Sequence, residues 1–278
     1  MAEIQIAAQR CTGCGSCVRD CLRNLLYLEA GKAKVKEDGL CIQCGHCVAV
    51  CPADAVRLAG CPEGEILPYD PAEFDIPGEH LLHFMKFRRS VRQFQARPVE
   101  EEKLALLLEG ARYAPTGGNL QNTRYILLDE KKNELTDLTL KTLYDAAERI
   151  GSDPALRGME RYRERWRGMY LQWKEQGRES LFYNAPCVLM AVSRYPRGGT
   201  GRLDAGLASA NVELLAHALG LGVCYVGFFT IAAALEPELY RRLGVSPKEE
   251  VVSTMAIGYP AVQYHRTVNR KPADLTRL

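Results

Sequence analysis

The stretches CTGCGSCVRDC at residues 11–21 and CIQCGHCVAVC at residues 41–51 decide how the N-terminal part of this chain folds. Each contains four cysteines in the pattern CxxCxxCxxxC, and the two patterns are offset by a constant 30 residues. The repeat extends beyond the cysteines, because Leu26 and Leu28 correspond to Val56 and Leu58. Residues 1–60 therefore form an internal duplication, and bound inorganic material is expected to replace much of its small core.

The spacing favours iron–sulfur clusters over zinc. Bacterial ferredoxins with two four-iron clusters use this run, and the fourth cysteine of each run binds the other cluster. The chain resembles that ferredoxin family over residues 1–60, although Leu22 stands where the family has the proline found here as Pro52. The alternative, a pair of zinc sites, usually consists of CxxC pairs separated by a longer loop. The resemblance implies two 4Fe-4S clusters, one on Cys11, Cys14, Cys17 and Cys51 and the other on Cys41, Cys44, Cys47 and Cys21.

Composition limits the functions of the rest of the chain. The 278 residues are 47% hydrophobic and 25% charged, which is typical of a globular protein of about two domains. A net charge of +2 provides no field that would attract nucleic acid or a membrane surface, so neither partner is expected. Residues 214–235 lack charged side chains, but Gly220, Gly222 and Gly227 interrupt them, which favours a core helix and strand over a membrane span. The N-terminus has no secretion signal, and we expect a cytoplasmic protein.

The distribution of prolines and of apolar residues predicts the domain organisation. Residues 61–80 contain four prolines and no periodicity, which predicts a linker between a domain at 1–60 and a larger domain at 81–278. Cys61, in this linker, is expected to be a free thiol, and Cys187 and Cys224 are expected to be core residues. The larger domain is predicted to be α+β. Helices are expected over residues 100–114, 130–150, 157–178, 203–219 and 232–243, and strands over residues 124–128, 187–193, 223–227 and 251–257.

Three segments of the larger domain carry candidate ligand-binding residues. KFRRSVRQF at 86–94 places Arg88, Ser90 and Arg92 at alternate positions, where an extended backbone directs all three toward one ligand. On its own, this segment is better explained as a solvated basic turn. APTGGNLQ at 114–121 ends a helix and presents Asn119, whose amide both donates and accepts hydrogen bonds. The third segment, GYP at 258–260, closes a strand before a basic tail.

Together, in this order and spacing, these segments resemble the nitroreductase-like flavoprotein family from residue 84 to residue 271. The helix start DAGLASAN at 204–211 and the VGF turn at 226–228 add to the resemblance, whereas Asn122-Thr123 replaces the Pro-Trp that often follows the loop glutamine. The resemblance implies an α+β flavin fold and an intertwined homodimer with FMN at its interface. It implies that Val226 and Gly227 face the N5 side of the flavin. The implied cofactor-binding residues are Arg88, Ser90, Arg92, Pro115, Thr116, Asn119, Gln121, Val226, Gly227, Arg270 and Lys271.

The two resemblances together predict an FMN-dependent oxidoreductase. Electrons from a reduced ferredoxin or another donor would enter the clusters and pass through the flavin to a small organic acceptor, such as a nitro compound, a quinone or an activated alkene. Two alternatives are a same-fold enzyme that performs dehalogenation or dehydrogenation, and a non-catalytic electron-transfer or redox-sensing relay. A further alternative concerns the aromatic face formed by Tyr162, Trp166, Met169, Tyr170 and Trp173, which is either a lid over the flavin or a packing seam.

Overall fold

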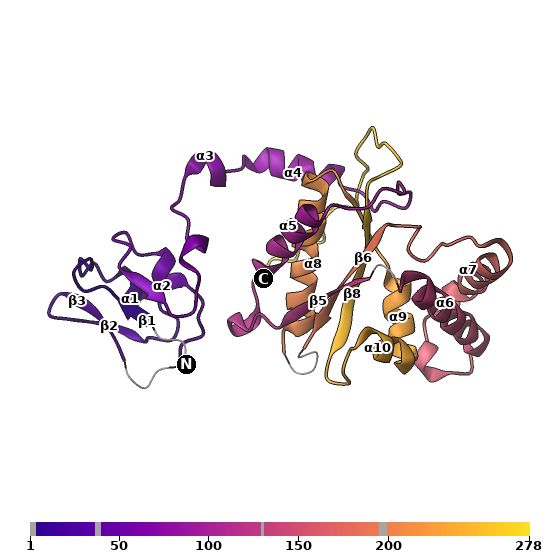
Figure 1. Cartoon of the computed structure of the whole chain (residues 1–278), viewed down its shortest axis with the longest axis horizontal. Helices are drawn as coiled ribbons and strands as arrows, with labels where there is room; N and C mark the ends of the chain where they lie inside the picture. Colours follow the sequence, from indigo (N-terminus) through magenta and orange to yellow (C-terminus); the bar gives the residue numbers. More distant parts are fainter. Residues whose placement is uncertain (1–3, 37–39, 129–130, 195–198) are drawn as a thin grey trace. The chain divides into compact units, whose positions relative to one another are not determined.

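The computed structural model describes residues 4–36, 40–128, 131–194 and 199–278 (Figure 1). The chain divides into two compact units. Unit 1 comprises Met1–Ile76 with Gly118–Leu120, and unit 2 comprises Pro77–Gly117 with Gln121–Leu278. Both units mix helices with antiparallel strands, which confirms the predicted α+β class.

Unit 1 shows the duplication in three dimensions. Its elements are β1 (Ile4–Ile6), α1 (Ser16–Asp20), β2 (Leu26–Glu29), β3 (Lys32–Val35), α2 (His46–Ala49) and β4 (Val56–Leu58). The strands form two antiparallel pairs, β1 with β4 and β2 with β3. Each helix begins after a glycine in the left-handed region, Gly15 at φ 73° and Gly45 at φ 76°, where other residues would be strained. The repeat in sequence is therefore a repeat in backbone conformation.

The segment that we predicted to be a linker contains short helices. It carries a 3₁₀ helix η1 (Glu63–Glu65), and α3 (Pro71–Phe74) begins where the Asp70 side chain accepts a hydrogen bond from the backbone N–H of Ala72 at 2.9 Å. Helix α4 (Gly78–Phe87) begins inside the segment and buries no residue in the described structure. Pro71 and Pro77 indicated a linker up to residue 80, which separated the start of α4 from its apolar residues at 81–87 and explains why the sequence did not predict this helix. The domain boundaries at residues 60 and 80 stay predictions.

Unit 2 is built on one four-stranded antiparallel sheet in the order β5-β6-β8-β7. Figure 1 labels β5, β6 and β8 of this sheet. The strands are β5 (Thr123–Leu128), β6 (Cys187–Ser193), β7 (Gly222–Tyr225) and β8 (Glu250–Gly258), and all four lie where the sequence predicts strands. Every residue of β6 is buried. Such complete burial requires that both faces of the sheet are covered.

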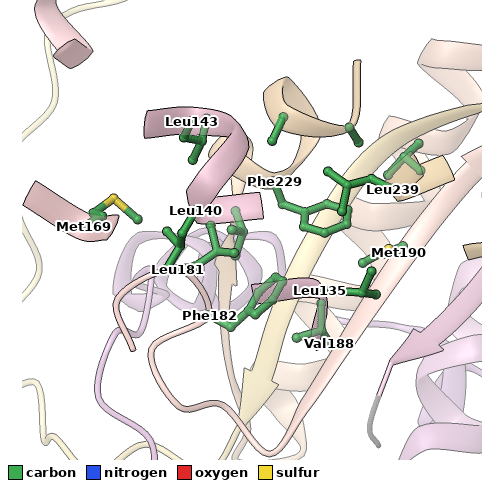
Figure 2. Close-up of a cluster of buried hydrophobic side chains, with 14 of the residues drawn as sticks. Leu135, Leu140, Leu143, Met169, Leu181, Phe182, Val188, Met190, Phe229 and Leu239 are labelled. Carbon is green, nitrogen blue, oxygen red and sulfur yellow. The ribbon is translucent and has the colours of Figure 1, made fainter. Parts of the chain in front are cut away.

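Helices cover the two faces. Helices α5 (Glu101–Arg112) and α8 (Gly201–Ala218) pack on one face of the sheet. They form a buried cluster with Leu189 of β6 and Met255 of β8. Helices α6 (Lys132–Arg149), α7 (Arg163–Gln176), α9 (Gly227–Leu235) and α10 (Pro237–Leu243) contribute to the cluster on the other face, which contains Val188 and Met190 (Figure 2). Alternate residues of one strand thus enter two separate cores, as the pleat of a strand requires.

Two predicted helices differ from those observed. The helix predicted over residues 232–243 is two helices, because Pro237 cannot donate the backbone hydrogen bond that would continue α9 and instead begins α10. The helix predicted over residues 157–178 begins only at Arg163, after the short 3₁₀ helices η3 (Pro154–Leu156) and η4 (Glu160–Tyr162). Residue 130, where α6 was expected to begin, lies outside the described residues.

The aromatic face of α7 is a packing seam. Trp166 is fully buried and stacks on Tyr162 with ring centroids 5.7 Å apart, and it forms a T-shaped pair with Phe228 with ring centroids 5.9 Å apart. Met169 is also buried, and Tyr170 and Trp173 pack against the same core. Cys187 and Cys224 are buried core residues, as predicted. Within the described residues, no helix combines the length and the apolar character needed to cross a membrane.

Candidate functional site

The cysteines of unit 1 gather in the two sets that the ferredoxin resemblance implies. One cavity is lined by Cys41, Cys44 and Cys47 of the second run together with Cys21, the fourth cysteine of the first run. Burial raises the pKa of Cys47 to about 11, and Cys41, Cys44 and Cys21 add to the rise. Soft thiolates converging from two segments are suited to an iron–sulfur cluster, so this set fits the implied ligand.

The second set likewise combines three cysteines of one run with the fourth cysteine of the other run. Burial raises the pKa of Cys17, with further rises caused by Cys51, Cys11 and Cys14. Cys51, the fourth cysteine of the second run, is therefore close to Cys17 of the first run, as are Cys11 and Cys14. A bound cation would remove the electrostatic cost of placing these thiolates side by side.

Backbone N–H groups point at the sulfur atoms. The N–H of Leu25 lies 3.4 Å from Cys21 Sγ, and the N–H of Ala55 lies 3.3 Å from Cys51 Sγ. These two contacts are equivalent in the repeat. N–H groups directed at sulfur stabilise negative charge there, and such hydrogen bonds help to set the reduction potential of a cluster.

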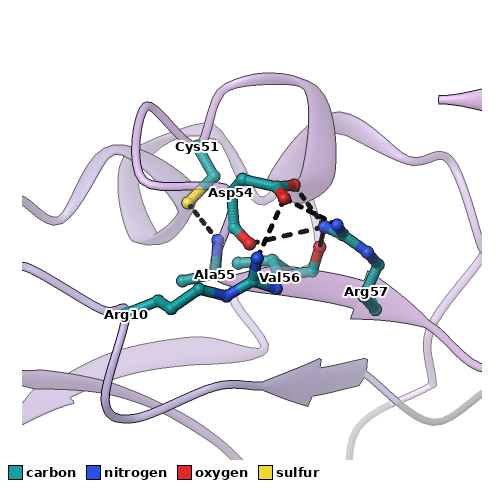
Figure 3. A network of polar contacts seen from close by, with 6 residues as sticks. All are labelled: Arg10, Cys51, Asp54, Ala55, Val56 and Arg57. Carbon is teal, nitrogen blue, oxygen red and sulfur yellow. Dashed lines mark hydrogen bonds and ion pairs between the residues drawn. The ribbon is translucent and has the colours of Figure 1, made fainter. Parts of the chain in front are cut away.

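An ion-pair network braces the turn after Cys51 (Figure 3). Asp54 Oδ2 accepts hydrogen bonds from Arg10 at 3.0 Å and from Arg57 at 2.7 Å. The guanidinium of Arg57 lowers the pKa of the Asp54 carboxyl group, and Arg10 adds to this effect. Arg10 directly precedes Cys11, and Asp54 follows Cys51 in the sequence. The network therefore links the chain segments next to Cys11 and Cys51, which belong to the same set.

In unit 2, the segment with Arg88, Ser90 and Arg92 runs along the edge of the sheet. Ser90 forms a parallel bridge with Val223 of β7, and the N–H of Val91 donates to Val223 O at 3.0 Å. Gly222 allows this close approach, since a Cβ atom there would overlap the Val91 side chain. The predicted extended conformation is therefore present beside an edge strand, but of the three predicted residues only Arg88 lines the neighbouring cavity.

A cavity of about 380 Å³ lies beside Arg88. Arg88 Nη1 donates to Glu213 Oε1 at 2.5 Å, and Glu213 and His217 of α8 line the cavity with it. Burial raises the pKa of the Glu213 carboxyl group, although Arg88 opposes the rise. The sequence analysis missed Glu213 and His217. The only sign of them was an ionisable residue at i and at i+4 in the apolar C-terminal half of the helix.

Val226 and Gly227, the next two predicted residues, lie in the turn after β7 and differ in exposure. Val226 is buried, and its N–H donates to Thr254 O at 2.8 Å. Gly227 is exposed and is the first residue of α9, where backbone N–H groups have no partner within the helix. This turn therefore offers backbone without a side chain, as a flat ring approaching it would require.

The residues of the predicted loop that belong to unit 2 lie beside the start of α8. Asp204, which is only 2% exposed, accepts hydrogen bonds from the Gly117 N–H at 3.2 Å and from Thr200 Oγ1 at 3.1 Å. Thr116 Oγ1 accepts from the Gln121 N–H at 3.1 Å. Thr116 and Gln121 line a second cavity of about 100 Å³. Pro115 is exposed beside them, and Asn119 has a positive φ of 54°.

The chain does not bring all the predicted FMN residues into one cavity. The Arg88 cavity includes Glu213 of α8, and the Thr116 cavity includes Asp204, nine residues earlier, which is about 14 Å along an α-helix. Arg270 and Lys271 lie in the exposed segment 261–278, which forms no helix or strand among the described residues. The FMN contacts stay predictions.

Residues 85–259 match the family model described as the nitroreductase family. The chain belongs to the nitroreductase family. Residues 10–56 match the model of the 4Fe-4S dicluster domain, so this nitroreductase-family chain carries a dicluster iron–sulfur domain at its N-terminus. Both predicted resemblances are confirmed, and the iron–sulfur interpretation prevails over zinc.

Solved structures share the fold of this nitroreductase-family chain. A nitroreductase with bound FMN from Bacteroides fragilis is 23% identical, with 71% of this chain and 98% of that chain covered and a TM-score of 0.54. A nitroreductase with bound FMN from Desulfitobacterium hafniense is 24% identical, with coverages of 70% and 97% and a TM-score of 0.52. A BluB-like flavoprotein from Clostridium difficile is 19% identical, with coverages of 69% and 94% and a TM-score of 0.53. No curated protein matches the chain.

Proposed function

We propose that this nitroreductase-family protein is a ferredoxin-linked FMN oxidoreductase that reduces a small organic acceptor, such as a nitro compound, a quinone or an activated alkene. One observation carries the proposal. A single chain combines two sets of four cysteines with a nitroreductase sheet whose edge holds Arg88, Ser90 and Arg92 in an extended segment. When bound to this chain, the clusters would supply one-electron chemistry and FMN would supply two-electron, hydride-level chemistry.

The residues of unit 2 fit FMN. The phosphate of FMN requires a cationic donor, and Arg88 provides a partly buried guanidinium beside a cavity of about 380 Å³. Gly227 leaves the turn after β7 open to a flat ring system. The charge of Arg92, two residues after Ser90, would stabilise negative charge on the pyrimidine edge of the ring. Similar folds with bound FMN in B. fragilis and D. hafniense support this assignment.

We further propose that the site is completed by a second copy of the chain. The Arg88 segment and the Thr116 loop lie beside different turns of α8, so a partner subunit can supply the loop that one chain holds too far away. Unit 2 also exposes large apolar side chains on α4, α5 and α8, among them Leu82, Leu106 and Leu203. Burial of such exposed apolar side chains against a second copy would be favourable, which supports a dimer.

The experiment that tests the proposed function separates the two entry points for electrons. In the Cys14→Ser variant, activity supported by a reduced ferredoxin-type donor should fall steeply, because one cluster loses a ligand. Activity driven by a small reductant that reaches the flavin directly should largely survive, because unit 2 has its own core. Cys61→Ser is the matched control, since Cys61 is exposed and belongs to neither set.

The ratio of the two activities, at equal FMN content, is the decisive quantity. Equal loss of both activities in Cys14→Ser would mean that the cluster is only structural. Equal retention would mean that electrons enter at the flavin without the clusters. Either outcome would contradict the proposed route.

A further inference from the structure

Helix α8 presents two ionisable side chains, Glu213 and His217, to the cavity beside Arg88, and the proposed chemistry uses neither. They are four residues apart and therefore share one face of the helix. The buried positions of this helix nearest to them are Val212 and Ala216. Burying a carboxylate or an imidazole beside such a core costs free energy unless another group interacts with it. The groups that contact Glu213 and His217 therefore indicate what these residues do.

The partner of His217 is helix α4. The imidazole ring lies 4.6 Å from the ring of Phe84 and 6.4 Å from the ring of Phe87, between centroids. Arg88 follows Phe87 directly and caps the helix, with its N–H donating to Phe84 O at 3.2 Å. The packing of α4 on His217 therefore fixes the point at which the Arg88 backbone leaves the helix.

The partner of Glu213 is the Arg88 side chain itself. The guanidinium is 23% exposed and the carboxylate 14% exposed, so their 2.5 Å contact is only partly screened by water. A guanidinium has five N–H donors, and this hydrogen bond uses one of them. The pair therefore fixes the orientation of Arg88 and leaves donors for a second anion.

We propose that Glu213 is a positioning residue of the flavin site, which holds the Arg88 guanidinium in the orientation that binds the phosphate of FMN. The inference rests on the proposed assignment of FMN to unit 2. An arginine side chain that is already held in one orientation loses less rotamer freedom on binding, so more of its interaction with the phosphate appears as affinity.

The test compares FMN with riboflavin, which has the same ring system and no phosphate. Apo-protein of the wild type, Glu213→Gln and Arg88→Ala is titrated with each flavin, and the ratio of the two dissociation constants gives the preference for the phosphate. Arg88→Ala should reduce this preference about ten- to a hundredfold. Glu213→Gln should reduce it about three- to thirtyfold. The riboflavin constants should not change in either variant, which also shows that the variants are folded.

A double variant tests whether Glu213 acts through Arg88. In Arg88→Ala/Glu213→Gln the preference for FMN should equal that of Arg88→Ala alone, because the residue being positioned is absent. Glu213→Asp, which keeps the charge and shortens the side chain, should give an intermediate preference. Asp145→Asn, in the exposed pair with Lys141, is the matched control and should resemble the wild type.

Two results would overturn the inference. One is a Glu213→Gln variant that prefers FMN as strongly as the wild type or more strongly. The other is an equal further loss when Glu213→Gln is added to Arg88→Ala. A wild-type protein that binds neither flavin would overturn the proposed function itself, and the inference with it.

Discussion

Arg124 of β5 forms two hydrogen bonds with Glu249, the residue before β8. Arg124 Nε donates to Oε1 at 2.7 Å, and Nη2 donates to Oε2 at 3.0 Å. This contact lowers the pKa of Glu249 from its usual 4.5 to about 2. Because the folded pKa lies below the unfolded value, the pair stabilises the fold fully above the unfolded pKa. The stabilisation is lost as the pH falls from 4.5 toward 2.

We therefore expect Glu249→Gln to lower the free energy of unfolding by about 1–3 kcal/mol at neutral pH. The difference from the wild type should narrow as the pH falls below about 5. Urea denaturation followed by tryptophan fluorescence measures this in unit 2 alone, since both tryptophans, Trp166 and Trp173, lie in α7. Asp145→Asn serves as the exposed control. A difference that stays constant from neutral pH to about pH 3.5 would be inconsistent with this account.

Pairs of cysteine substitutions test the exchange of the fourth ligand between the runs. Cys11→Ser/Cys51→Ser removes two ligands from one set and should leave about four iron and four sulfide per chain, against about eight of each in the wild type. Cys11→Ser/Cys21→Ser removes one ligand from each set and should weaken both clusters. Iron and sulfide analysis of anaerobically prepared protein measures both variants. The reverse pattern would show that each run binds its own cluster.

The proposed dimer can be tested on helix α4, which exposes Leu81, Leu82 and Met85. Leu82→Arg places a charge in this apolar surface and should shift the protein from dimer to monomer in light scattering, with loss of FMN. Leu67→Arg is the control, since Leu67 is also exposed but lies outside unit 2. A monomer that retains its full FMN content would show that one chain suffices for the site.

Substitution of Trp166 tests the packing seam. Trp166→Ala opens a cavity beside Tyr162 and Phe228 and should lower the free energy of unfolding by about 3–5 kcal/mol. Trp173→Phe, which loses the 3.0 Å hydrogen bond to Asp137, should cost about 1 kcal/mol. Urea denaturation of both variants measures the difference. An unchanged stability of Trp166→Ala combined with a raised KM for the acceptor would restore the lid interpretation.

The fold of unit 2 was largely predictable because its strands are covered on both faces. A strand such as β6 is then a continuous apolar run, and its helices carry apolar residues at helical spacing. Helix α4 was missed because it follows the prolines that indicated a linker, and because His217, against which its Phe84 packs, lies far away in the sequence. Pro237 indicated the break between α9 and α10, but the apolar residues on both sides of it favoured one continuous helix.

The candidate sites also contain residues that the sequence predicts and residues that it does not. The cysteine runs are short local patterns, so their chemistry could be inferred from spacing, whereas the Arg88 segment pointed to a flavin only through its resemblance to the nitroreductase-like family. Glu213 lies 125 residues from Arg88, and only the packing of α4 on α8 brings them together. No local pattern encodes such a pair. Asp204 was noted only as the start of a helix motif, whereas the structure shows that its carboxylate holds the Gly117 loop.

Strand β8 is the last strand in the chain, and it lies between β6 and β7 in the sheet. During synthesis, β6 and β7 therefore leave the ribosome without the strand that separates them. Neither apolar layer of unit 2 can close until β8 arrives, because its residues Met255 and Ala256 belong to different layers. The long-range pairing makes folding of unit 2 a late event, whereas unit 1, whose main segment ends at Ile76, can acquire its clusters on the nascent chain.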